Sequence, residues 1–155
     1  MTAAHIHLMV VHLPVVGCPL VLALLVLGHL LREDILLRVG YGLLVMCAAF
    51  GAMAYYSGPS AYELLETRLA PEKAWVEHHA VLARVAFVGL VLLGVVAAQA
   101  LLQFFQEEPP ARALRLGILV GTAVLCYLLA WSAHAGGQIG HPEIREGLTW
   151  LFPGP

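Results

Sequence analysis

Four long apolar runs constrain this chain more than any other feature of its sequence. They extend from about residue 8 to 31, 39 to 56, 80 to 102 and 116 to 131. Each is close to the roughly 20 residues that cross the hydrocarbon core of a bilayer. Because lipid offers no hydrogen-bond partners, each run has to be helical so that its backbone groups bond one another. The sequence therefore predicts an all-α membrane protein, a single domain of residues 1–155 formed by a four-transmembrane-helix bundle.

Composition supports this class and excludes others. Apolar residues make up 61% of the 155 residues and charged residues only 12%, whereas a soluble domain has about 25% charged residues. The formal net charge is -2 and no basic stripe is present, so we expect no nucleic-acid partner. The three cysteines fall inside apolar runs. This placement argues against a disulfide framework or a zinc site of cysteine pairs, and predicts small core residues.

The polar connections divide the chain between two membrane sides. Arg32-Glu33-Asp34 and the segment 106–112 are short polar loops that share one side, which we call the far side. The N-terminus, the loop of residues 57–78 and the C-terminal tail share the other, the near side. Within the long loop, Ser60 followed by Glu63 forms a capping box. We therefore expect a short amphipathic helix in the 57–78 loop, acting either as a lid over the near side or as an ordinary interfacial connector.

The distribution of Lys and Arg gives an expected orientation. Only these residues count strongly in the positive-inside rule. The far side has four of them near helix ends, and the near side has three. The balance favours the far side in the cytoplasm, and Arg84 near the other end of the third span reduces this margin. We expect a multi-pass protein of the bacterial inner membrane with its near side in the periplasm.

Seven of the eight histidines map to the near side, and His29 alone lies at the far end of the first span. Ionisable residues at membrane depth are costly and indicate function. Anchoring of helix ends does not require so many imidazoles, because Trp and Tyr serve that purpose. The near-side histidines are His5, His7, His12, His78, His79, His134 and His141.

The helical spacing of these histidines predicts a layered site. At 1.5 Å per residue, His12 lies about 7.5 Å deeper than His7 in the first span. His79 opens the third span, His134 ends the fourth, and His141 returns to the surface after it. Three helices thus present imidazoles to one region. Neutral imidazole is the commonest metal ligand, and four-helix bundles build cofactor sites from facing side chains.

Imidazole ligation suits haem iron, copper or zinc. A bis-histidine haem b needs one histidine from each of two facing helices and an apolar slot between them, which a bundle supplies. Arg84 follows His79 by five residues and is placed to pair with a haem propionate. A salt bridge from Arg84 to Glu77 or Glu63, or simple snorkelling, explains this arginine equally well.

A compact non-haem site is the rival hypothesis. The segments Glu77-His78-His79 and His141-Pro142-Glu143 combine carboxylate with imidazole side chains. Such a set would hold copper, zinc or non-haem iron. For any single histidine, an interfacial role without a ligand explains its position as well as ligation does.

Four short motifs occur in a fixed order along the chain. They are His7-Leu-Met-Val-Val-His12-Leu-Pro14, Ser57-Gly58-Pro59, the set Glu77, His79 and Ala83, and Ala135-Gly136-Gly137-Gln138-Ile139-Gly140-His141. Together they resemble a broad family of four-span bacterial membrane proteins of unassigned function. The resemblance covers most of residues 7–143.

The resemblance implies a cytochrome b-like bundle in which His7, His12, His79 and His141 are the leading ligands of the metal. Four such histidines suffice for two bis-histidine haems. This chain departs from the pattern at Leu8, where a proline often stands. His134 is an additional imidazole and is an alternative ligand to His141.

We expect a membrane b-type cytochrome with one or two haems that transfers electrons as a subunit of a larger redox complex. A partner subunit, a periplasmic electron carrier or quinone would exchange electrons with it. With both axial positions filled, the chain is more an electron-transfer subunit than an enzyme on its own. The alternatives are a non-haem copper-, zinc- or iron-binding or transport protein, and a structural membrane subunit.

Overall fold

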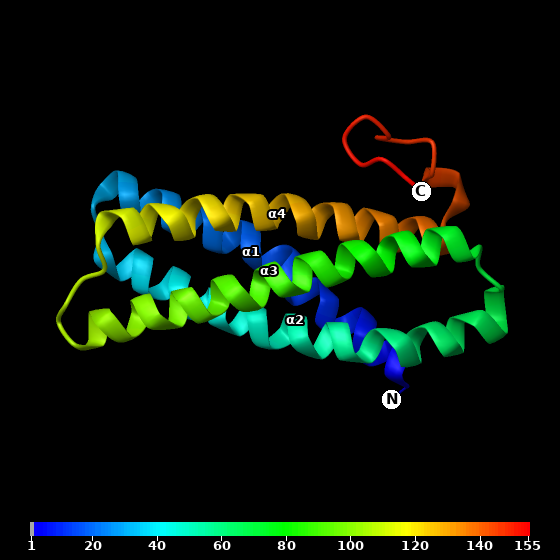
Figure 1. Ribbon diagram of the computed structural model, residues 1–155, viewed down its shortest axis with the longest axis horizontal. Coiled ribbons are helices and arrows are strands. Elements are labelled where there is room, and N and C mark those ends of the chain that lie inside the picture. The colour runs from blue at the N-terminus through cyan, green and yellow to red at the C-terminus, as the bar shows by residue number, and fades with distance from the viewer. Residues whose placement is uncertain (1) are drawn as a thin grey trace.

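The computed structural model describes residues 2–155, with the side chains of all of these except Ala3, Arg68 and Leu69. They form four long helices and one short 3-10 helix, and the described residues contain no strand (Figure 1). The elements are α1 (Ala3–Leu31), α2 (Asp34–Leu69), α3 (Lys73–Phe105), α4 (Arg112–Gly140) and η1 (Pro142–Ile144). The predicted all-α, four-span architecture is confirmed.

All four long helices are long and apolar enough to cross a membrane. They contain 29, 36, 33 and 29 residues, whereas about 20 residues suffice to span the hydrocarbon core. The helices therefore project beyond the core, and the expected spans of 16 to 24 residues underestimated them. A helix that extends from the hydrocarbon core into the aqueous phase keeps its backbone hydrogen bonds. The ends of the apolar runs therefore do not mark the ends of the helices.

The separate amphipathic helix expected in the 57–78 loop is not present. Instead α2 continues through Ser57-Gly58-Pro59 to Leu69, with Pro59 inside the helix. Proline removes one backbone donor, but the helix on either side keeps its own bonds. A left-handed residue, Ala70 with φ 41°, then ends α2. The interpretation of Ser60 and Glu63 as a capping box that starts a helix was therefore wrong. Only residues 70–72 connect α2 to α3.

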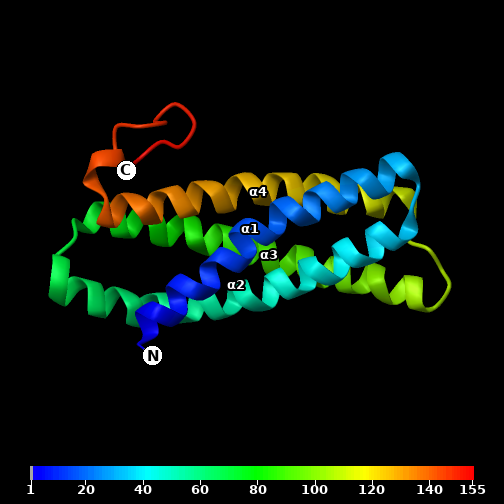
Figure 2. The same ribbon diagram turned by 180° about the vertical axis from the view of Figure 1, so that it is seen from behind.

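The helices form a ring in which each packs against two others. Helix α1 packs against α2 and α4, and α3 packs against the same two. Figures 1 and 2 show α1 slanting across the bundle between its two ends. The turn from α1 to α2 and the loop from α3 to α4 lie at one end, which is the far end. The start of α1, the connection from α2 to α3 and the C-terminal segment lie at the other, near end, as predicted.

The apolar core occupies the far part of the bundle. Its buried side chains interlock from Leu37 and Phe104 at the far end as far as Cys18, Cys47 and Leu129. Closer to the near end, the interior holds the buried apolar residues Leu82 and Ala135 and two buried polar residues of α4, Ser132 and Gln138. The histidine end of the bundle therefore mixes polar with apolar side chains.

Glycines set the distance between neighbouring helices. A methyl group added at Gly94 of α3 would lie 2.6 Å from the Cβ of Ala48 on α2. Both atoms are fixed to helix backbones, so no rotamer change relieves the contact. The same group added at Gly42 meets nothing within 4 Å. Gly94 is thus required for close packing of α2 and α3, whereas Gly42 is not.

We expect Gly94→Ala to destabilise the protein by about 1–3 kcal/mol, the usual cost of overpacking. The thermal unfolding midpoint in detergent should fall accordingly. Gly42→Ala is the matched control and should keep the midpoint or raise it, because alanine is the better helix former. Equal midpoints for the two variants would contradict the packing described here.

Candidate functional site

His7 of α1 is fixed against α2 near the near end of the bundle. Its Nδ1 atom lies 2.9 Å from the carbonyl oxygen of Ala54 and 3.3 Å from Oγ of Ser57. A carbonyl oxygen only accepts hydrogen bonds, so Nδ1 carries the proton and Nε2 keeps a free lone pair. Gly58 lies close to the ring, because a Cβ atom added at Gly58 would be 3.6 Å from Cε1 of His7. The ring is half-buried.

His79 of α3 is fixed against α4 in the same way. Its Nδ1 atom lies 2.9 Å from the carbonyl oxygen of Ser132, so the proton again belongs on Nδ1 and the lone pair on Nε2. A Cβ at Gly136 would lie 3.1 Å from Cε1 and 3.3 Å from Nδ1 of this ring. Any larger residue at position 136 would therefore move the imidazole. His79 too is half-buried.

The two hairpins of the bundle thus repeat one arrangement. In each, a histidine near the start of one helix donates from Nδ1 to a carbonyl of the next helix, Ala54 or Ser132. In each, a glycine stands four residues after that carbonyl, Gly58 or Gly136. In a helix that fourth residue donates its N–H to the same carbonyl. Because glycine has no side chain, the imidazole of a neighbouring helix can reach the second lone pair of that carbonyl oxygen.

His7 and His79 both lie toward the near end of the bundle and are half-buried. Neither Nε2 atom forms a hydrogen bond with any described residue. Each ring therefore keeps one nitrogen lone pair that is free to bind a ligand.

The other predicted ligands lie elsewhere. His12 is exposed on α1, and its Nδ1 bonds the carbonyl of Leu8 in its own helix. Arg84 is exposed on α3. His141 follows α4, is 67% exposed, and pairs with Glu143 at 3.0 Å. The structure does not bring these three side chains together with His7 and His79.

His141 and Glu143 form a local pair at the surface. The pKa of the Glu143 carboxyl lies below its ordinary value because its own backbone N–H and the His141 side chain hydrogen-bond to it. Both side chains are mostly exposed, so the pair contributes little to stability.

His78 and His134 are two further histidines toward the near end. Their Nε2 atoms are buried and have no hydrogen-bond partner. The ring of His78 lies 6.1 Å from Trp131 and that of His134 lies 5.2 Å from Phe152. Buried polar atoms without partners are uncommon and call for an explanation. The sequence predicted that His134 ends the fourth helix, but α4 continues to Gly140, and what covers His134 was not predicted.

The C-terminal segment folds back over α4, where Phe152 lies against His134. Tyr127 donates a hydrogen bond to the carbonyl of Leu151 at 2.9 Å, and Trp131 donates to that of Pro153 at 3.2 Å. Arg145 anchors the start of the segment through Glu72 at 2.6 Å. The tail is therefore an ordered part of the near end.

No three-ligand metal centre is found in the part of the chain that the structure describes. No group of three or more His, Cys, Asp or Glu side chains lies close enough together to hold an ion. The mixed set of carboxylate and imidazole suggested by Glu77-His78-His79 and His141-Pro142-Glu143 is therefore not assembled among these residues.

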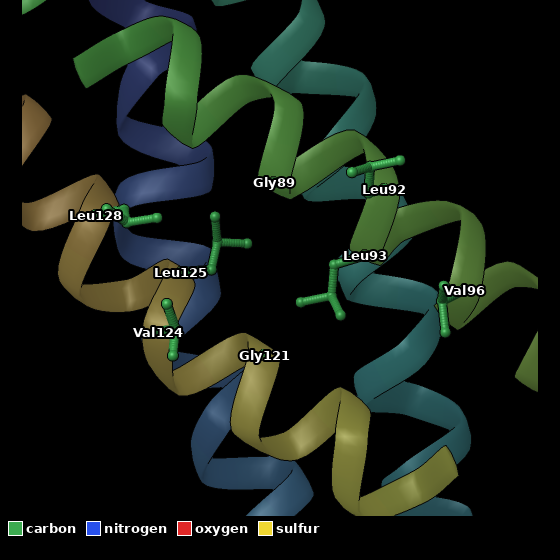
Figure 3. Close-up of a pocket in the computed structure, with 8 residues that line it drawn as sticks. All are labelled: Gly89, Leu92, Leu93, Val96, Gly121, Val124, Leu125 and Leu128. Atoms are coloured by element: carbon green, nitrogen blue, oxygen red, sulfur yellow. The ribbon is translucent and has the colours of Figure 1, made fainter. Parts of the chain in front are cut away.

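An apolar groove of about 340 Å³ between α3 and α4 is a separate feature (Figure 3). Its lining contains only aliphatic side chains and glycines, such as Leu93, Leu125 and Gly121. Without a polar or titratable group it supplies no chemistry and belongs to the lipid-facing surface.

Sequence comparison places the chain in a family. Residues 3–142 match the family described as "Predicted membrane protein (DUF2231)", and the chain belongs to it. This confirms the resemblance to membrane proteins of unassigned function, while the cytochrome b-like character is not part of that match. No curated protein and no solved structure matches the chain.

The hydrogen bonds of His7 and His79 predict their tautomer. In the purified protein, long-range ¹H–¹⁵N spectra should show the proton on Nδ1 in both rings, since both donate to carbonyls. His7→Gln and His79→Gln would assign the two signals. A proton on Nε2 of either ring in the folded protein would contradict the geometry.

Proposed function

We propose that this protein is a membrane b-type cytochrome in which His7 and His79 are the two axial ligands of one haem. The observation that carries the proposal is the repeated arrangement of the two rings. Each is held through Nδ1 by a carbonyl of the neighbouring helix, and each has a free Nε2 atom. Metal-ligating histidines usually have their other ring nitrogen bonded in this way.

The donor set fits a haem better than a bare ion. A bare zinc ion takes about four protein ligands or three and a water, and the described residues assemble no group of three. A macrocycle supplies the equatorial ligands itself, so two axial imidazoles are enough.

Each residue of the site would have a defined role. The carbonyls of Ala54 and Ser132 orient the two rings and raise the basicity of Nε2. Gly58 and Gly136 let the rings approach these carbonyls. The chemistry that a bound haem supplies is a one-electron couple of its iron, with no open coordination position when both axial sites are filled.

Electron transfer, rather than catalysis by this chain alone, follows from this ligand set. The lipid bilayer is its environment, and a partner has to deliver and remove electrons. We propose a redox partner subunit, a periplasmic electron carrier or quinone in this role. The small excess of far-side Arg residues supports a location in the inner membrane of a bacterium with the near end in the periplasm.

His12, His134, His141 and Arg84 take no part in the proposed single site. His12 and Arg84 lie on exposed faces of their helices, and His141 lies beyond α4. A second haem would need two further imidazoles that face each other, and His78 and His134 instead lie under the C-terminal segment.

The proposal is tested by optical spectra and iron content of protein expressed with ample haem and purified in detergent. We expect sharp α and β bands on reduction and one iron per chain. His7→Ala and His79→Ala should remove these bands, whereas His12→Ala and His141→Ala are matched controls that should keep them. A featureless spectrum of the unaltered protein would refute the proposal, and so would bands that persist in both ligand variants.

A change next to a ligand gives a finer test. Gly136→Ala places a methyl group 3.1 Å from Cε1 of His79, whereas Gly140→Ala meets nothing within 4 Å. We expect the first change to shift the reduced bands or lower haem occupancy about 10–100-fold, as loss of a ligand-orienting contact does. The second should leave both unchanged. Identical spectra and occupancy for the two variants would argue against His79 as a ligand.

A further inference from the structure

The segment after η1 forms a loop that leaves the near end of the bundle and returns to it. Arg145 at its start stacks on Trp75 of α3, with the guanidinium carbon 4.6 Å from the ring centroid. Gly154 packs against the same ring, because a Cβ atom added there would lie 2.9 Å from Cη2 of Trp75. Figures 1 and 2 show the chain between these points folded back along the outside of α4. We call residues 145–154 the return loop.

Two side chains of α4 hold the return loop by hydrogen bonds. Tyr127 donates from its hydroxyl to the carbonyl of Leu151 at 2.9 Å, and Trp131 donates from Nε1 to the carbonyl of Pro153 at 3.2 Å. The ring of Phe152 lies 5.9 Å from that of Tyr127. The loop is therefore fixed to a definite stretch of α4, one turn of helix long.

The two donors belong to a part of α4 that lies at membrane depth. Arg115 near the start of α4 pairs with Asp34 at 3.1 Å, and such a charged pair belongs at or beyond the far boundary of the hydrocarbon core. Tyr127 and Trp131 follow Arg115 by 12 and 16 residues, or about 18 and 24 Å along the helix. Both lengths are shorter than the roughly 30 Å of the core. The return loop therefore reaches from the near end down to the hydrocarbon boundary.

The backbone of the return loop is prepared for this depth. Irregular backbone is tolerated there only where its polar groups are bonded within the protein. The carbonyl of Leu148 accepts the N–H groups of Leu151 and Phe152, at 2.9 and 2.8 Å. The carbonyls of Leu151 and Pro153 accept the two donors of α4, and proline has no N–H to satisfy. Three carbonyls that would be costly to bury are thus bonded.

The outward surface of the return loop is apolar. No charged residue occurs between positions 147 and 154. Trp150 is 81% exposed and Leu148 is 49% exposed. On α4 the exposed side chain of Val124 belongs to the lipid-facing surface that leads up to the loop. Trp is enriched where a membrane meets water, because its indole has an apolar body and one polar N–H. This surface fits lipid better than water.

We propose that the return loop is a re-entrant segment that inserts into the bilayer leaflet of the near side, with Trp150 embedded among the lipids. Arg145 holds the start of the loop at the aqueous side, through Glu72 at 2.6 Å and the carbonyl of Gln138 at 3.1 Å. The two donors of α4 bond the inserted backbone. The partner of this surface is lipid, at the level where acyl chains meet headgroups. The histidine pair takes no part, so the proposal stands apart from haem binding.

The experiment places a nitroxide spin label at residue 150 of the protein in phosphatidylcholine vesicles. The label is attached to Trp150→Cys in a background where Cys18, Cys47 and Cys126 are replaced by alanine. Glu146→Cys in the same background is the control position at the polar start of the loop. Electron paramagnetic resonance then measures collisions with oxygen, which concentrates in lipid, and with a water-soluble nickel chelate. We expect oxygen to dominate at position 150 and nickel at position 146.

Removal of the donors tests the role of the bonded backbone. Tyr127→Phe combined with Trp131→Phe leaves two carbonyls of the loop unbonded, which is costly at this depth. We therefore expect the label at position 150 to become accessible to nickel. Tyr56→Phe is the matched control, because Tyr56 is 73% exposed on α2 and does not hold the loop. An unchanged preference for oxygen in the double variant would contradict the role of the two donors.

Two results at position 150 would overturn the proposal. Nickel access equal to that at position 146 would place the loop in water. Shielding from both reagents would show that protein, such as a second copy of this chain, covers the surface instead of lipid. If the cysteine-free background does not fold, lipids with brominated acyl chains decide. They should quench the fluorescence of the unaltered protein more than that of Trp150→Phe, and equal quenching would refute the insertion.

Discussion

The backbone carbonyls of the helices are the groups on which the candidate site depends. In lipid every backbone N–H and C=O has to be bonded within the protein, which makes each crossing a continuous helix. A helical carbonyl that already accepts one N–H keeps a second lone pair. Ala54 and Ser132 use that lone pair to hold His7 and His79. The helical carbonyl groups that satisfy backbone hydrogen bonds within the membrane therefore also orient these two imidazoles.

Much of the fold could be predicted because lipid simplifies the problem. Apolar runs locate the four crossings, and the short polar loops fix which ends of the helices share a face. The ends of the helices were less predictable, since a helix that leaves the bilayer keeps its own hydrogen bonds. At Pro59 the local signals favoured a break, yet α2 continues to Leu69.

The sequence placed most of the histidines at one end of the bundle, but it could not show which of them lie in the interior and which lie on the surface. His7 and His12 are five residues apart, and at about 100° per residue they point about 140° away from each other. They therefore do not serve one interior site on a straight helix, and the structure directs His7 inward and His12 outward. The roles of Ala54 and Ser132 could not be found from residue type, because their backbones act. The glycines that follow them, Gly58 and Gly136, were present in the motifs and are the signal that could have indicated them.

The depth of the histidine pair has an electrical consequence. From Leu31 at the far end of α1 to His7 there are 24 residues, or about 36 Å of helix, which is more than the roughly 30 Å of the hydrocarbon core. The pair therefore lies at the near boundary of the insulating layer. In the proposed cytochrome, an electron that passes between this position and a partner on the near side would cross little of the transmembrane voltage. Its transfer would gain only a small part of the about 2.3 kcal/mol per 100 mV that a full crossing involves, so such an exchange would proceed almost equally well in an energised and a discharged membrane.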